Sequence, residues 1–164
     1  MKRTITMALA LVMAAGWLAR AEEAAPAVLT VPSEIKRVVV IRLKNNTDLL
    51  KGLEQAVQKE KIKTGVFLSG AGSLTSFHVH TVNNTTLPAT QAFTKQTGGV
   101  DLLAVTGYVL NGRVHAHITL VDDKKAFGGH LHEGTTVFTF AIITLGILDD
   151  RPDLSRFDDW KWGR

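Results

Sequence analysis

Residues 114–134 read VHAHITLVDDKKAFGGHLHEG, and most of what can be predicted about the fold starts from this stretch. Residues 114–121 alternate between apolar and polar side chains, which is typical of a half-buried strand. The charged residues at 122–125 indicate a tight turn, and residues 126–131 return as a second strand. The stretch is therefore predicted to form an antiparallel β-hairpin.

Four of the six histidines lie in this hairpin. A two-residue loop at 123–124 places His117 opposite His130. The same register places His115 opposite His132. Because residues i and i+2 of a strand point to the same side, all four rings would share one face, with opposed Cβ atoms about 4.5–5.5 Å apart. Three or four neutral imidazoles at this spacing can enclose a divalent cation, and zinc is the expected ion in the absence of thiolates.

Two alternatives to this metal site stay open. A bulge at the two adjoining glycines, 128–129, would shift the register by one residue and remove the four-histidine face. Otherwise, the histidines could be a polar strand face without a metal. For His78 and His80, a second H-x-H pair, a solvated strand face is the favoured interpretation, although they could line the same pocket.

The regions around the hairpin are predicted to add strands and one helix. Leu49, Leu53 and Val57 recur at helical spacing, so an amphipathic helix is expected from residue 49 to about residue 61. Asn111-Gly112 between two apolar runs indicates a tight hairpin turn. Strands are expected at 35–43, 65–69, 74–82, 102–110 and 135–148, with a turn at 70–73, a loop at 83–88 and an edge strand at 89–99. The fold class that follows is α+β, sandwich-like, with a mainly antiparallel sheet of about seven strands and one main helix.

The composition is that of one ordinary globular domain. The chain has 164 residues, of which 45% are hydrophobic and 21% are charged, which is too apolar for a disordered tail. It has no cysteine, which excludes a disulfide scaffold, a thiolate zinc finger and a cysteine nucleophile. Any metal site must therefore use His, Asp or Glu.

The N-terminus has the layout of a secretory signal peptide. Lys2 and Arg3 precede an apolar stretch, and Ala19-Arg20-Ala21 follows it as an A-x-A pattern. Cleavage after Ala21 would lower the formal net charge from +4 to about +1. No run of Lys or Arg would then remain to bind phosphates.

The expected organisation has four parts. They are a signal peptide at 1–21, a flexible lead-in at 22–33, one domain at 34–149 and a C-terminal tail at 150–164. The tail either docks as a flap or is mobile. The expected location is the periplasm or the exterior of the cell, with no membrane span after cleavage.

The hairpin resembles the signature segment of the PPC (plants and prokaryotes conserved) domain family. The S-G-A-G-S-L at 69–74 is similar to a strand-end turn of that family. The D-L-L at 48–50 and the L-G-I-L at 145–148 also fall where the family has them. The resemblance covers roughly residues 37–148.

This resemblance implies an α/β fold with a mostly antiparallel sheet, assembled as a homotrimer. It also implies a metal-binding histidine trio, carried over onto His115, His117 and His130. His132 is not a regular part of the family pattern and is an additional candidate for the metal site or its pocket. Plant members carry a separate AT-hook that binds DNA, and prokaryotic members are often called DNA-binding by inheritance of that name. This chain has no R-G-R-P core of an AT-hook.

The run at 135–148 bears on assembly. It is β-branched and strongly apolar, so it is predicted to be a long central strand buried on both faces. The helix would cover one face and a neighbouring subunit the other. The alternative is that the chain's own core covers both faces.

Three functions are weighed. The first is an exported PPC-like protein that binds a divalent metal, with zinc as the expected ion. The sequence identifies neither its biological role nor a small-molecule ligand. The second is a metal-dependent hydrolase, since three histidines leave a fourth coordination position for water; Glu133 is discounted as its base because strand alternation points it away. The third, DNA binding, ranks last. Lys59, Lys61 and Lys63 are interpreted as a solvated face, and export would separate the protein from chromosomal DNA.

Overall fold

The computed structural model describes residues 26–159. The expected signal peptide at 1–21 lies outside these residues, as do the first positions of the lead-in and the end of the tail. The described residues form six strands and one helix. In chain order these are β1 Ile35–Lys44, α1 Leu49–Lys59, β2 Gly65–Val82, β3 Gln91–Leu110, β4 Arg113–Val121, β5 Ala126–Leu131 and β6 Thr136–Leu148. Within the described range, no helix has the length and hydrophobicity to cross a membrane.

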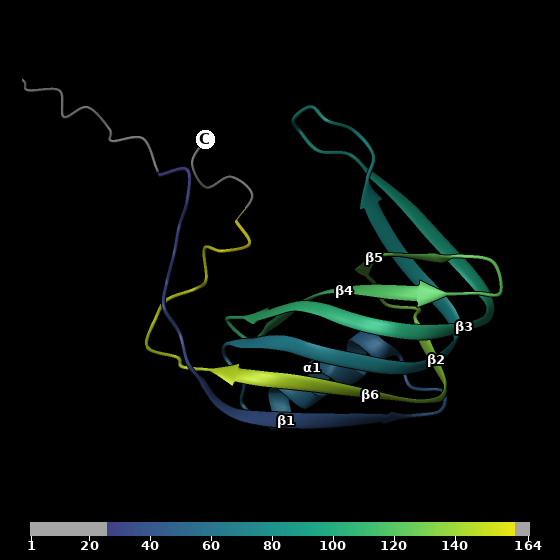
Figure 1. Ribbon diagram of the computed structural model, residues 1–164, viewed down its shortest axis with the longest axis horizontal. Helices are drawn as coiled ribbons and strands as arrows, with labels where there is room; N and C mark the ends of the chain where they lie inside the picture. The colour runs from purple at the N-terminus through teal and green to yellow at the C-terminus, as the bar shows by residue number, and fades with distance from the viewer. Residues whose placement is uncertain (1–25, 160–164) are drawn as a thin grey trace, which may run out of the picture.

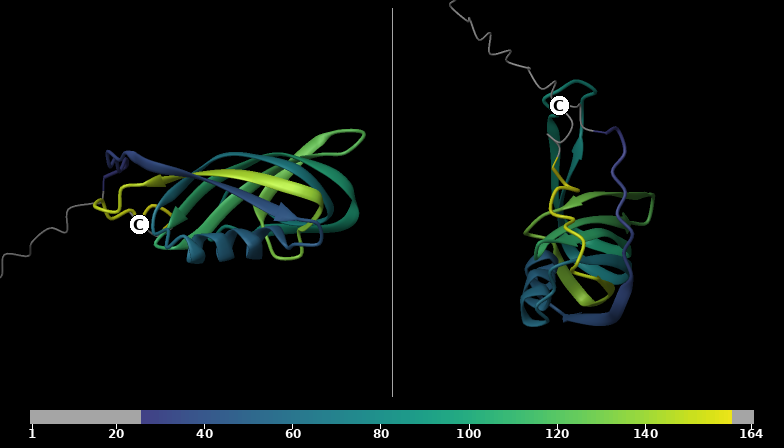
Figure 2. Two further views of the ribbon diagram at one scale, coloured as in Figure 1. Left: turned by 90° about the horizontal axis from the view of Figure 1, so that it is seen from below. Right: turned by 90° about the vertical axis from the view of Figure 1, so that its left-hand side faces the viewer.

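The strands form a single sheet in the order β1-β6-β2-β3-β4-β5 (Figure 1). All of the strand pairs are antiparallel. β5 also pairs with β2, so the four strands from β2 to β5 close into a ring. The helix lies along one face of the sheet (Figure 2, left). The mostly antiparallel sheet is as predicted, but the fold is mainly sheet rather than α+β with about seven strands.

The smaller number of strands comes from β2 and β3, each of which runs without a break where two strands were expected. The turn predicted at 70–73 is wrong. A Cβ on Gly72 would lie 2.4 Å from the Phe140 carbonyl oxygen, and one on Gly70 would lie 2.6 Å from Val105 Cγ2. These glycines therefore allow neighbouring strands to approach closely, and the chain stays extended. β3 pairs with β2 from Gly65 to Val82 and so joins the strands predicted at 89–99 and 102–110.

The helix closes the core on one side of the sheet. Leu49, Leu53 and Val57, the residues that predicted it, are all buried. They pack with the inward residues of the strands, which are Leu74, Val105, Val137, Ile143 and Leu145 among others. Asp48 caps the helix by accepting a hydrogen bond from the Lys51 backbone N–H at 3.0 Å. The helix ends at Lys59, two residues before the predicted end.

The central strand β6 is covered on one face only. Its inward residues Ala141 and Ile143 are fully buried, whereas Phe138 is 49% exposed and Phe140 and Ile142 are each 40% exposed. The chain itself therefore covers one face of this strand and leaves the other open, and burial of the open face by a neighbouring subunit stays a prediction. The alternative, that the chain's own core covers both faces, is wrong.

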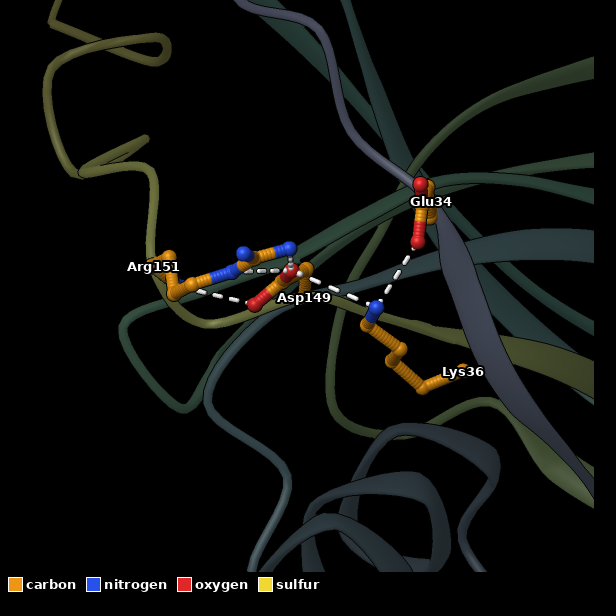
Figure 3. A network of polar contacts seen from close by, with 4 residues as sticks. All are labelled: Glu34, Lys36, Asp149 and Arg151. Carbon is orange, nitrogen blue, oxygen red and sulfur yellow. Dashed lines mark hydrogen bonds and ion pairs between the residues drawn. The ribbon is translucent and has the colours of Figure 1, made fainter.

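A polar network joins the start of β1 to the end of β6 (Figure 3). Lys36 Nζ lies 2.8 Å from a Glu34 carboxylate oxygen and 3.5 Å from one of Asp149. Arg151 pairs with Asp149 from the other side and holds the pKa of that carboxyl well below its usual range. The Asp149 N–H also donates to the Glu34 carbonyl at 3.0 Å. These contacts therefore hold the start of β1 against the end of the neighbouring strand β6.

Candidate metal centre

All six histidines of the chain gather in one cluster. His78 and His80 lie in β2, and His115 and His117 lie in β4. His130 lies in β5, and His132 directly follows its last residue. His130 lies in the middle. Its ring centroid is 4.7 Å from that of His80, 4.9 Å from His115, 5.0 Å from His117 and 5.3 Å from His132.

One trio consists of His115, His117 and His130. The pairing of His117 with His130 is confirmed, and the glycines at 128–129 do not shift the register. The turn explains this: the Asp122 carboxylate accepts hydrogen bonds from the Lys124 and Lys125 N–H groups, both at 2.8 Å. One ring nitrogen from each histidine lies within 4.8 Å of the others, so this trio could hold a metal ion.

His132 does not pair with His115, so that part of the predicted register is wrong. The last residues of β5 also pair with β2 along their other edge, with His80 opposite His130, and the β4–β5 pairing goes no further than His130. The His132 N–H donates to the His78 carbonyl at 3.0 Å. The four-histidine face predicted for the hairpin is therefore divided between two strand pairs.

A second trio results, consisting of His80, His130 and His132. Its ring nitrogens also lie within 4.8 Å of one another. His80 Nδ1 and His132 Nε2 share a hydrogen bond of 2.6 Å. The favoured interpretation of His78 and His80 as a solvated strand face is wrong, because both side chains are half-buried among other rings. The repeated H-x-H spacing was the signal that could have included His80.

Lowered pKa values favour the neutral form of four of these rings, those of His80, His117, His130 and His132. Burial and, to a smaller extent, the neighbouring His115 and His80 together lower the pKa of His130 to about 4. Burial is also the main cause that lowers the pKa values of His80, His117 and His132. Six clustered imidazoles would repel one another if protonated. As neutral rings they present lone pairs, which is the form that binds metals.

The tail contributes a carboxylate that sequence reasoning missed. Asp158, with a side chain only 14% exposed, lies 2.6 Å from an Arg113 guanidinium nitrogen and 3.5 Å from His115 Nδ1. A cavity of about 480 Å³ lies between this carboxylate, His115, His130 and the helix residue Glu54. Carboxylates beside metal-binding histidines commonly orient the ring. No pattern in the sequence connects this tail position with β4.

The Glu133 side chain takes no part in the cluster. Its carboxylate lies 2.8 Å from Lys51 Nζ on the helix, with the side chain 61% exposed. Its backbone carbonyl accepts a hydrogen bond from His78 Nδ1–H at 2.8 Å. This placement agrees with the expectation that its side chain points away from the histidines.

Residues 31–149 match the family model of the Plants and Prokaryotes Conserved (PCC) domain. The fold is similar to that of a PPC protein from Pyrococcus horikoshii, with a TM-score of 0.63 and 24% identity, covering 78% of this chain and 93% of that one. It is also similar to a metal-containing protein from Archaeoglobus fulgidus, with a TM-score of 0.62 and 18% identity, covering 73% of this chain and 86% of that one. A protein of Bacteroides thetaiotaomicron that is named for DNA binding has a TM-score of 0.60 and 19% identity, covering 73% of this chain and 83% of that one.

Among curated proteins, the chain is similar to a bifunctional protein GlmU of Synechococcus sp. The two are 30% identical over 129 residues, which are 74% of this chain and 18% of that protein. The chain thus spans less than a fifth of this relative's length.

Proposed function

The chain belongs to the Plants and Prokaryotes Conserved domain family, and from this premise we propose that it is an exported, metal-binding member of that family. The proposed ligands are His115, His117 and His130, and the proposed ion is zinc. The observation that carries the proposal is the convergence of their three ring nitrogens within 4.8 Å. The biological role in which the metal serves stays undefined.

The chemistry of the donors fits such an ion. The trio offers imidazole nitrogens only, and the chain has no cysteine. Imidazoles favour zinc, copper and nickel over magnesium and calcium, which prefer oxygen. A bound ion of this kind would act as a Lewis acid. The residues around it would fix the rings, with β4 and β5 setting their spacing and Asp158 orienting His115.

The test is the metal content of the purified protein, prepared without a His-tag. We expect His117→Ala to lose one zinc ion per chain relative to the parent, because it removes one of three ligands. His78→Ala is the matched control, since His78 belongs to neither trio, and it should bind as the parent does. Equal zinc content in the parent and in His117→Ala would refute the assignment.

Assembly into a homotrimer is part of the proposal. Support comes from the open face of the sheet, where the pairing register places Val38, Val40, Phe140 and Ile142 on the same side. Large exposed apolar patches commonly mark protein interfaces, and the occupant we propose is a second and third copy of this chain. Ile142→Glu should lower the solution mass of a trimeric parent, whereas Val82→Glu, at an exposed position near the end of β2, should not. A monomeric parent would contradict this part of the proposal.

The other two functions gain no specific support from the described residues. Lys59, Lys61 and Lys63 are exposed at the end of the helix, next to the acidic Glu60. Hydrolysis would need a group placed to move a proton, but the Glu133 carboxylate pairs with Lys51 and the Asp158 carboxylate pairs with Arg113. Both functions therefore rank below metal binding. A comparison of the location of the protein with and without residues 1–21 tests the proposed export, which would separate it from DNA.

A further inference from the structure

We propose that His80, His130 and His132 form a second transition-metal site, so that His130 lies between two ions. The inference rests on the proposed function in one respect, because His130 belongs to both trios. The other two ligands, on β2 and after β5, have no part in the first site.

The contact between His80 and His132 is the first observation. Their ring nitrogens are 2.6 Å apart and share one proton. Two imidazole ligands of a tetrahedral zinc ion are about 3.3 Å apart, given Zn–N bonds of about 2.0–2.1 Å. When a zinc ion takes its place, the proton moves to the other nitrogen of the ring that carried it, and the two bonded nitrogens need to separate by only about 0.7 Å.

The backbone holds these rings in place, which is the second observation. His80 and His130 are directly opposed in the β2–β5 pair. The carbonyl of His132 accepts a hydrogen bond from Thr135 Oγ1 at 3.0 Å, and the Thr135 side chain is fully buried. A Cβ on Gly129 would lie 2.5 Å from the His80 carbonyl oxygen, so the close approach of the two strands depends on this glycine. Ligands fixed in this way lose little entropy when a metal binds.

The surroundings favour a nitrogen-preferring ion. The Phe93 ring lies 5.3 Å from that of His80 and 5.2 Å from that of His132, so it covers the trio with an apolar group. The nearby Glu133 carboxylate is paired with Lys51. The donors are then imidazoles alone, which suit Zn²⁺, Cu²⁺ and Ni²⁺.

One shared ring can serve both ions. Imidazole has two ring nitrogens on different edges, and a neutral ring carries its single proton on one of them. When each nitrogen binds an ion, that proton is released to solvent, and metal binding drives such a release. Loading of both trios therefore converts His130 from imidazole to imidazolate, with one proton released.

The test is a zinc titration of the purified protein without a His-tag, followed by metal analysis after removal of free zinc. We expect two ions per chain in the parent and one in His132→Ala. His80→Ala is an independent second variant with the same expected loss. His78→Ala is the control with both sites intact, and the urea midpoint of each metal-free variant shows that it is folded.

The two assignments fail in different ways. One ion per chain in the parent, retained in His132→Ala and His80→Ala, would overturn the second site and leave the first intact. Retention of one ion in His117→Ala but its loss in His117→Ala/His132→Ala would support the second site. No zinc in any of the proteins would overturn both sites.

Discussion

Replacement of Asp48 should destabilise the protein more than the loss of an ordinary helix cap. One carboxylate oxygen accepts from the Lys51 N–H at 3.0 Å, as an N-cap does. The other accepts from the Gly134 N–H at 2.7 Å in a partly buried position. Asp48 therefore joins the start of the helix to the turn between β5 and β6.

The magnitude follows from these two bonds. Loss of an N-cap costs about 1 kcal/mol. A hydrogen bond to a charged group contributes about 1.5–3 kcal/mol. We therefore expect Asp48→Ala to lower the free energy of unfolding by about 2.5–4 kcal/mol. Asp48→Asn keeps one carbonyl oxygen for the cap but presents an amide group towards the Gly134 N–H, so it should lose about 1.5–3 kcal/mol.

Equilibrium unfolding in urea, on metal-free protein at pH 7, measures both values. The slope with urea concentration should stay the same in all three proteins, so that a shift in midpoint reports stability alone. Two results would refute the reasoning. One is a loss below about 1 kcal/mol in Asp48→Ala, the cost of the cap alone. The other is an equal loss in Asp48→Asn and Asp48→Ala, which would mean that the cap contributes nothing.

Three further predictions follow from the cluster and its surroundings. The free energy of unfolding of the metal-free protein should fall as pH decreases from about 6.5 to 4, because the unfolded chain binds a proton on His130 that the folded chain, with a His130 pKa of about 4, does not. The urea midpoint should therefore vary less with pH in His130→Asn than in the parent. The same pH dependence in both proteins would contradict the prediction. Asp158→Asn should weaken zinc binding by about tenfold, as loss of a carboxylate that orients a ligand does; competition with a chelator measures this, and an unchanged affinity would exclude that role. Gly129→Ala should destabilise the protein by about 1–3 kcal/mol in urea unfolding, because its Cβ would press on the His80 carbonyl, and a loss within error would show that the strands can separate without cost.

The first histidine trio was predictable because its contacts are local. Only thirteen positions separate His117 from His130, and the turn between them has side chains that set its length. A strand period of two and a two-residue loop are then enough to determine which residues face each other. The helix was predictable for the same reason, since Leu49, Leu53 and Val57 repeat within a few turns.

The rest of the cluster depends on contacts between distant segments. His80 meets His132 because the end of β5 pairs with β2 as well as with β4, and no local pattern specifies that additional pairing. Asp158 reaches His115 from the tail. The glycines at 70 and 72 have the composition of a turn, and only the neighbouring strands reveal that they allow close packing.

The sequence by itself determined the hairpin, its register at His117 and His130, the helix and the mostly antiparallel sheet. These features follow from side-chain period and turn chemistry, which act over a few residues. Only the tertiary structure decided the closed ring of β2 to β5, the unbroken course of β2 and the second histidine trio. Pairing between distant strands depends on how the whole sheet packs against its core, and that free energy is not contained in any single segment.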